Sequence, residues 1–161
     1  MLTDVDDITV LDADLDDPRH ARAVVELIAA YARDPMGLGR DLDAGVRAAL
    51  LDGLRAHPTT MVVLAFDVDR PVGIAVCFVG FSTFAARPLV NIHDLAVLPD
   101  ARGRGVGRRL LEHVEARARA RGCCKITLEV LDRNEPALRL YRAFGFGGDG
   151  GGMTRFLQKR L

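Results

Sequence analysis

Apolar residues recur along this chain at two spacings, and the changes of spacing divide it into helices and strands. Apolar side chains three and four residues apart predict four helices. Runs rich in β-branched residues and bounded by turn residues predict six strands. The helices are expected to begin at Asp16, Asp41, Val106 and Asn134, and the strands to cover residues 8–13, 60–66, 72–79, 89–98, 125–131 and 153–160. The order β-α-α-β-β-β-α-β-α-β indicates one α+β domain over residues 1–161, with a mixed, mostly antiparallel sheet flanked by helices.

A glycine-rich segment joins the strand at 89–98 to the helix that follows it, and reads Arg102-Gly103-Arg104-Gly105-Val106-Gly107. Small residues let the backbone approach a ligand closely, and the first N–H groups of a helix have no partner within the helix. Because these groups carry the positive end of the helix dipole, the segment predicts a seat for a phosphate or pyrophosphate. The spacing G-x-G-x-G excludes the dinucleotide fingerprint, and the chain contains no P-loop motif.

A second motif lies downstream, at the start of the last predicted helix. Asn134 is a good N-cap, Glu135 suits the first turn, and Pro136 is tolerated there because its missing N–H would have no helical partner. Tyr141 lies close to two turns further along and therefore on the same face as Asn134. Gly145 is placed to end the helix.

These two motifs, in this order, resemble the acetyl-CoA loop and the second signature of the GNAT acetyltransferase superfamily. The resemblance covers most of the chain and is sharpest from Ile92 to Phe146. It implies the GNAT fold and acetyl-CoA as co-substrate, with the pantetheine arm beside a strand that diverges from its neighbour and the pyrophosphate on the loop. The cofactor-binding residues that it implies are Leu95, Ala96, Val97, Arg102, Gly103, Arg104, Gly105, Val106, Gly107, Arg108, Asn134, Ala137 and Tyr141.

Acetyl transfer to an amine requires a base, because an alkylamine is mostly protonated at neutral pH and cannot attack in that form. His93 and Asp94 are both candidates. His93 has the more suitable ordinary pKa, and Asp94 could instead orient His93 or bind the ammonium group. Successive strand residues face opposite sides, so both reach one site only if a β-bulge intervenes. The departing thiolate benefits from an acid, for which Tyr141 is the candidate, and a backbone N–H near residues 95–97 could polarise the thioester carbonyl.

Within this superfamily, the chain is similar to the diamine and polyamine acetyltransferase branch at Phe81-Ser82-Thr83-Phe84, at His93-Asp94 and at Asn134-Glu135-Pro136. That branch typically has Glu where this chain has His93, and often has a Trp in its tail, whereas this chain contains no Trp. We expect a small primary amine or a polyamine as the acceptor. The alternatives are a protein N-terminus or lysine, or a non-catalytic acyl-CoA-binding regulatory module.

Composition narrows the partners. The chain has 22 basic and 22 acidic residues, which gives no electrostatic reason to expect nucleic acid or a membrane surface as a partner. No apolar run is long enough to span a bilayer, and residues 1–7 lack a signal-peptide pattern, so we expect a cytoplasmic protein. The three cysteines have neither a disulfide framework nor a zinc spacing, and no metal is expected. The resemblance also suggests a homodimer formed through the C-terminal strand.

Overall fold

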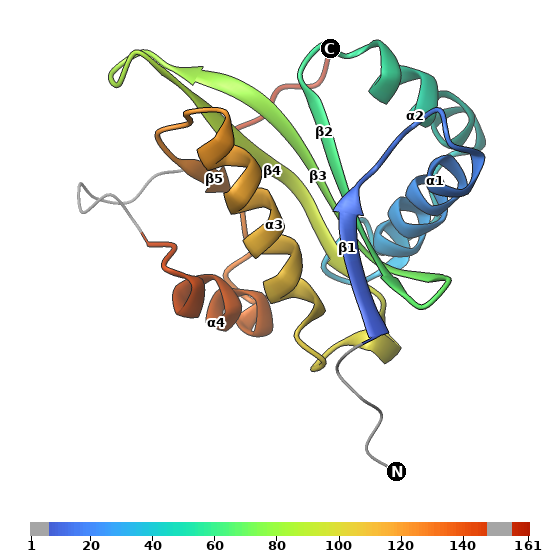
Figure 1. Cartoon of the computed structure of the whole chain (residues 1–161). Coiled ribbons are helices and arrows are strands. Elements are labelled where there is room, and N and C mark those ends of the chain that lie inside the picture. The colour runs from blue at the N-terminus through green and yellow to red at the C-terminus, as the bar shows by residue number, and fades with distance from the viewer. Residues whose placement is uncertain (1–6, 148–155) are drawn as a thin grey trace.

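In the computed structural model, which describes residues 7–147 and 156–161, five strands form one sheet with helices on both faces (Figure 1). The strands are β1 (Ile8–Asp12), β2 (Thr60–Asp67), β3 (Arg70–Ser82), β4 (Arg87–Val97) and β5 (Ile126–Leu128). They lie side by side in chain order; β1 to β4 pair antiparallel, and β5 pairs parallel with β4. This arrangement confirms the predicted α+β class and the mixed, mostly antiparallel sheet.

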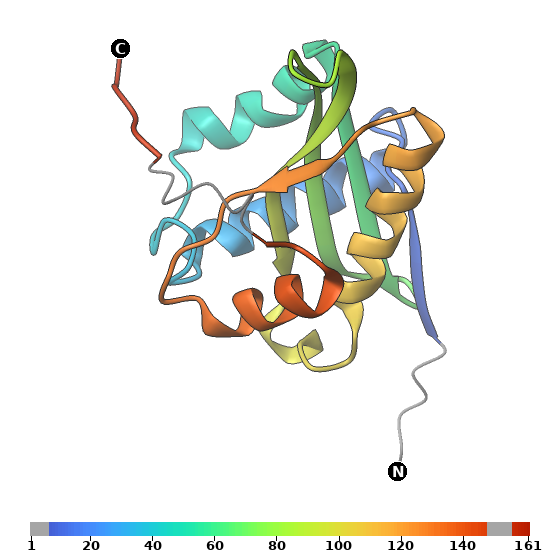
Figure 2. The same ribbon diagram turned by 90° about the vertical axis from the view of Figure 1, so that its left-hand side faces the viewer.

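Two pairs of helices sandwich the sheet. The helices are α1 (Pro18–Arg33), α2 (Ala44–Ala56), α3 (Val106–Ala120) and α4 (Glu135–Phe144), with a short 3-10 helix, η2 (Pro99–Ala101), before α3. Figures 1 and 2 show α1 and α2 on one face and α3 and α4 on the other. Two hydrophobic clusters form the core, one on each face of the sheet, and alternate residues of the buried strand β2 point into one or the other. Leu64 lies in the cluster that contains Leu27 of α1, and Val63 lies in the cluster that contains Leu110 of α3.

The ends of the helices follow the expected local chemistry, with one exception. Asn134 caps α4 by accepting a hydrogen bond from the backbone N–H of Ala137 at 3.3 Å, and Gly145 ends this helix with a φ of 101°. The exception is α2, which begins at Ala44 and not at Asp41. The loop before it folds back, so that the N–H of Arg40 bonds to the carbonyl of Ala32 and the next residues stay outside the helix.

Three strand predictions differ from the structure. β3 extends beyond the predicted 72–79 at both ends, because its pairing with β2 begins at Arg70 and its pairing with β4 continues to Ser82. β5 covers three residues, fewer than the predicted 125–131, because its parallel pairing with β4 ends at Leu128. Of the strand predicted at 153–160, residues 153–155 lie outside the described residues, and residues 156–160 form no strand. These last residues are exposed, and a strand needs a neighbour for its backbone groups. Among the described helices, none is both long and apolar enough to cross a membrane.

Candidate active site

A gap opens in the sheet where β4 and β5 separate. The two strands pair at only three positions, the last of which joins Ile92 to Leu128. β4 then continues to Val97, paired over residues 94–97 with β3 alone. The side of this segment that faces away from β3 therefore has no strand partner among the described residues. This is the divergence that the family resemblance implied, and its unpaired backbone can bind an extended ligand as a strand would.

A β-bulge at His93 adjoins this gap. Val76 pairs with Asp94 while the next residue of β3 pairs with Ile92, so His93 is the extra residue. Ile92 and Leu95 both pack on the α3–α4 side although they are three residues apart, so His93 and Asp94 share the single position between them. Both therefore lie on the α1–α2 side, which is the condition under which both could reach one site.

The surroundings of the two candidate bases differ. His93 is exposed, and its ring lies 5.7 Å from that of Phe78, edge to face. Asp94 is half-buried; burial raises the pKa of its carboxyl, and His93 beside it acts in the opposite direction. Burial also raises the pKa of Tyr31, on α1, and the Asp94 carboxylate adds to that rise. Asp94 and Tyr31 are therefore near neighbours on the α1–α2 side.

Tyr141 approaches the gap from the opposite face. Its side chain is 8% exposed and packs with the α3–α4 core, edge to face against Phe146 at 5.7 Å between ring centres. Burial, together with nearby Tyr31, raises the pKa of Tyr141 to about 12. The phenol is therefore a neutral hydrogen-bond donor at physiological pH. Leu95 and Ala137 pack against the same core cluster, so the end of β4 and the first turns of α4 flank one side of the gap.

The glycine-rich loop leads from β4 into α3. Gly105, with a φ of 78°, immediately precedes the helix, and the first helical bond runs from the N–H of Arg109 to the carbonyl of Gly105. The N–H groups of the first turn are therefore without helical partners and form an anion seat. A Cβ at Gly107 would lie 3.0 Å from the side chain of Leu140, so glycine is what allows α3 to approach α4 here.

The arginine side chains of this loop face carboxylates of the protein itself. Each of the three guanidinium groups donates to a different acidic residue, as follows: Arg102 to Asp34 at 2.6 Å, Arg104 to Asp67 at 2.5 Å, and Arg108 to Glu112 at 2.9 Å. What the described loop offers to an anion is consequently its backbone more than its side-chain charge.

A cleft of about 380 Å³ lies between the C-terminal half of α1 and the end of β4, where Ala96 and Val97 line it. His93 and Asp94 lie on the same side of the sheet but are not among its lining residues. Its lining combines apolar residues such as Leu27 and Leu98 with Tyr31, Asp34 and Arg102. The sequence analysis did not identify Tyr31 or Asp34 as site residues. Tyr31 only continues the helical spacing of α1, and Asp34 contacts the loop across 68 positions of sequence, so no local pattern reports either contact.

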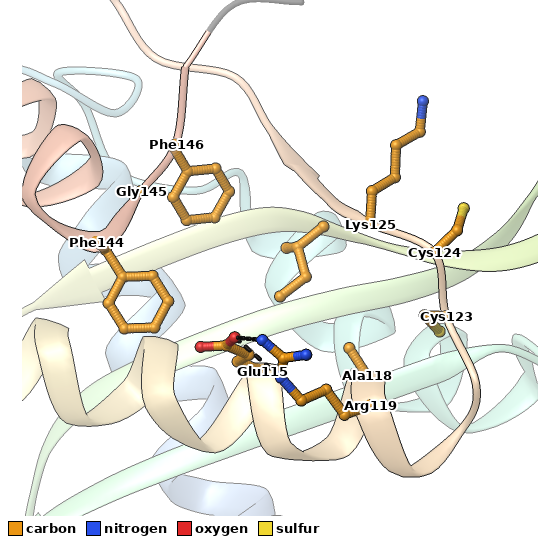
Figure 3. Close-up of a pocket in the computed structure, with 10 residues that line it drawn as sticks. Glu115, Ala118, Arg119, Cys123, Cys124, Lys125, Phe144, Gly145 and Phe146 are labelled. Carbon is orange, nitrogen blue, oxygen red and sulfur yellow. Dashed lines mark hydrogen bonds and ion pairs between the residues drawn. The ribbon is translucent and has the colours of Figure 1, made fainter.

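A second cavity, of about 230 Å³, lies between α3, the start of β5 and the end of α4 (Figure 3). Cys123 and Lys125 line it on one side and Phe144 and Phe146 on the other, and an ion pair between Glu115 and Arg119 crosses its floor. None of the predicted site residues lines this cavity. Cys124 also lines this cavity. The third thiol, Cys77, is buried, and burial raises its pKa to about 12, which makes it a poor nucleophile.

Comparisons with known proteins identify the family of this chain. The sequence model described as "Acetyltransferase (GNAT) family" matches residues 23–146. The chain is 38% identical over 95 residues to streptothricin acetyltransferase of Streptomyces lavendulae, and this match covers 59% of the chain but only 48% of that protein. It is 35% identical over 116 residues to thialysine N-epsilon-acetyltransferase of Mus musculus, covering 67% of the chain and 68% of that protein.

A solved structure gives the same result for the fold. The crystal structure of a probable acetyltransferase matches with a TM-score of 0.80 at 22% identity, over 95% of this chain and 99% of that one. The family match, the split between β4 and β5, and the loop at the start of α3 agree with one another. The chain belongs to the GNAT acetyltransferase family.

Proposed function

We propose that this protein transfers the acetyl group of acetyl-CoA to the primary amine of a small molecule by direct attack, without an acetyl-enzyme. The observation that carries the proposal is the arrangement around the gap in the sheet. Asp94 and His93 lie on the α1–α2 side, and Tyr141 lies on the α3–α4 side. A base and a hydrogen-bond donor thus flank one unpaired strand segment, as acyl transfer between two bound molecules requires.

The described backbone fits an acetyl-CoA molecule. Its extended pantetheine arm would pair with the free edge of residues 95–97, and its pyrophosphate would lie against the backbone of residues 103–108. Asn134 and Ala137, in the first turn of α4, would line the other wall. A backbone N–H near residues 95–97 would polarise the thioester carbonyl. When bound, the cofactor supplies an activated acyl group. The residues of the chain hold the two reacting molecules in position and accept or donate the protons.

We assign the base to Asp94. It is the less exposed of the two candidates, and burial raises the pKa of its carboxyl toward the range in which a base works best. One ammonium proton of the acceptor passes to this carboxylate, the nitrogen–carbon bond forms, and the carbon–sulfur bond breaks. The nitrogen loses a second proton as it becomes the amide, the leaving sulfur takes up one proton to depart as the CoA thiol, and Asp94 returns its proton to solvent. The Tyr141 hydroxyl donates a hydrogen bond to the sulfur as negative charge develops on it. His93, whose ring lies edge to face against Phe78, is next to Asp94 on the same side of the sheet.

The cleft beside α1 is our candidate for the acceptor site. Its volume of about 380 Å³ suits a small molecule better than a peptide. The relatives named above are acetyltransferases of streptothricin and of thialysine, which are small molecules. A small amine is therefore favoured over a protein N-terminus or lysine, and over a non-catalytic acyl-CoA-binding module.

We further infer a cytoplasmic homodimer. The three described thiols are free, as is usual in a reducing compartment. β5 is the last strand of the sheet among the described residues, and Phe156 and Leu157 of the C-terminal segment are 70% and 85% exposed. An open strand edge and an exposed apolar tail suit pairing between two copies. Sedimentation equilibrium tests this; a monomer at micromolar concentration would contradict it.

The test of the function is release of thiol from acetyl-CoA against a panel of amines: monoamines, putrescine, spermidine, amino acids, aminoglycosides and short peptides. A parallel calorimetric titration with CoA measures cofactor binding without any acceptor. Turnover with a small-amine class supports the proposal and names the acceptor. CoA binding without turnover with any amine would contradict the enzyme assignment, and absence of CoA binding would contradict the cofactor site as well.

A further inference from the structure

Arg102 connects three parts of the structure. Its Nη2 donates to the Oδ2 of Asp34 at 2.6 Å, and its Nε donates to the backbone carbonyl of Val97 at 3.0 Å. Arg102 belongs to the segment that leads to α3, Val97 is the last residue of β4, and Asp34 is the residue that ends α1. One side chain therefore ties the phosphate loop and the open strand to the helix that forms the wall of the cleft.

Asp34 connects Arg102 to the last turn of α1. Its side chain is 13% exposed, and its second oxygen accepts the N–H of Met36 at 2.8 Å. Its own N–H bonds to the carbonyl of Tyr31 at 3.1 Å. The following turn is packed tightly, since a Cβ at Gly37 would lie 2.1 Å from that same carbonyl. The position of Asp34 consequently fixes the last turn of α1, which carries Tyr31 into the lining of the cleft.

We propose that Arg102 is a positioning residue for the acceptor, holding Tyr31 and the end of α1 at a set distance from β4, and that its side chain is not a ligand of the cofactor's phosphates. The inference rests on the proposed function, since it takes the cleft beside α1 as the acceptor site. It differs from what the motif alone implies, in which Arg102 belongs to the cofactor.

The tie has a second consequence for the acceptor. Asp34 is the one acidic residue among the described residues that line the cleft, and the Arg102 guanidinium occupies it. The hydrogen bond from Arg102 keeps the pKa of Asp34 below its ordinary value, so the pair stays ionised. A second ammonium group on the acceptor therefore finds no free carboxylate there, and Asp94 remains to bind the reacting amine. Loss of Arg102 would release Asp34 to bind such a group.

The experiment compares Arg102→Gln and Asp34→Asn, singly and together, with Arg70→Gln as the matched control. Arg70 pairs with Asp100, which precedes the same loop, also at 2.6 Å and with the same 53% side-chain exposure as Arg102. The ion pairs and side-chain hydrogen bonds of the described residues do not join Asp100 to α1. For each variant we would measure the KM of the best monoamine and of a diamine at saturating acetyl-CoA, and the Kd of CoA by calorimetry.

We expect each single variant of the tie to raise the monoamine KM about five- to tenfold, which corresponds to the loss of one hydrogen bond whose charge is partly screened by solvent. The Kd of CoA changes less than about twofold on the same scale. The double variant is no worse than either single one, because both remove the same contact. Arg102→Gln, which frees the Asp34 carboxylate, improves the diamine relative to the monoamine, and Asp34→Asn does not. Arg70→Gln leaves every value unchanged.

A second readout is independent of turnover. The chain has two tyrosines and no tryptophan, so in a Tyr141→Phe background Tyr31 is the only strong fluorophore. Quenching by acrylamide should increase when either partner of the tie is removed, because the last turn of α1 loosens. It should not increase with Arg70→Gln.

Several results would overturn the proposal. A rise in the CoA Kd of tenfold or more with Arg102→Gln, without effect of Asp34→Asn, would return Arg102 to the phosphates. If the variants raise the KM of the monoamine and of the diamine equally and also lower thermal stability, the pair of Arg102 and Asp34 has only a structural role. Unchanged acrylamide quenching would show that this pair does not hold α1 in place. If the unaltered protein turns over no amine, the proposed function fails, while the quenching series still decides whether the tie exists.

Discussion

Tyr141 permits a quantitative prediction. It is 8% exposed, and burial raises its pKa to about 12, roughly two units above the ordinary value of about 10 for a tyrosine. Two units correspond to about 2.7 kcal/mol in favour of the neutral phenol in the folded protein. Because the folded pKa is raised, this stabilisation is complete below pH 10 or so, and is lost as the pH rises from about 10 to about 12.

The same shift bears on the catalytic role that we propose for Tyr141. An ordinary cysteine-type thiol has a pKa of about 8.5, so complete transfer of a proton from a phenol of pKa about 12 is uphill by roughly 5 kcal/mol. The hydroxyl is therefore expected to stabilise the leaving sulfur as a hydrogen-bond donor. Tyr141→Phe should lower kcat by about 10²-fold, at the low end of the range for general acid catalysis, and leave the Kd of CoA nearly unchanged.

The assay is alkaline titration of tyrosinate absorbance, combined with the rate measurements. Because the chain contains two tyrosines and no tryptophan, Tyr141→Phe and Tyr31→Phe each leave a single titrating group. With Tyr31→Phe, the remaining group should titrate well above an ordinary tyrosine. An ordinary pKa for Tyr141, or full activity of Tyr141→Phe, would refute the reasoning from burial to role.

Three further predictions follow from other contacts. Asp94→Asn should remove the acidic limb of the pH profile of kcat/KM, and in the unaltered protein this limb should lie above the ordinary carboxyl range because burial raises the pKa of Asp94. A limb that survives Asp94→Asn and disappears with His93→Gln would assign the base to His93. Gly37→Ala should lower the thermal midpoint of unfolding, because the new Cβ would lie 2.1 Å from a backbone oxygen. Gly53→Ala, on α2 with open space around it, should stabilise the folded protein by up to about 1 kcal/mol. Equal shifts of the two midpoints in calorimetry would refute the steric argument. Asp12→Asn should lower the free energy of unfolding by about 1 kcal/mol or less at neutral pH and leave it unchanged in acid. Burial raises the pKa of Asp12, but its hydrogen bonds outweigh burial and hold this pKa below the ordinary value. A loss of stability that persists below that pKa, in urea titrations at several pH values, would contradict this reasoning.

Local patterns were enough to predict most elements of the fold. The N-cap Asn134, the stop at Gly145 and the glycine loop before α3 are each decided by neighbours within a few residues, and the structure confirms them. The start of α2 was misplaced because it depends on a loop that folds back onto Ala32. The strand at 125–131 was drawn too long because its length is set by where β4 stops pairing with it.

The candidate site was only partly predictable for the same reason. The sequence identified His93 and Asp94 and the condition that both could reach one side, but the bulge that meets this condition arises from the register of β3 against β4. The roles of Tyr31 and Asp34 depend on contacts with β4 and the loop that are far apart in the sequence. A single sequence shows which residue types are present and leaves such long-range contacts to the folded chain.

The gap between β4 and β5 has an expected consequence for the lifetime of the protein in a cell. Among the described residues, the outer edge of residues 94–97 has no strand partner, and such an edge is the kind of surface on which other unfolded or partly folded chains pair and aggregate. A ligand that pairs with this edge hides it, and by binding only the folded state it adds about 2.7 kcal/mol of stability at a hundred times its Kd. The abundance of acetyl-CoA would then set both the catalytic rate of this protein and the fraction of it that escapes aggregation and proteolysis. A cell short of acetyl-CoA would therefore lose the protein itself as well as its co-substrate.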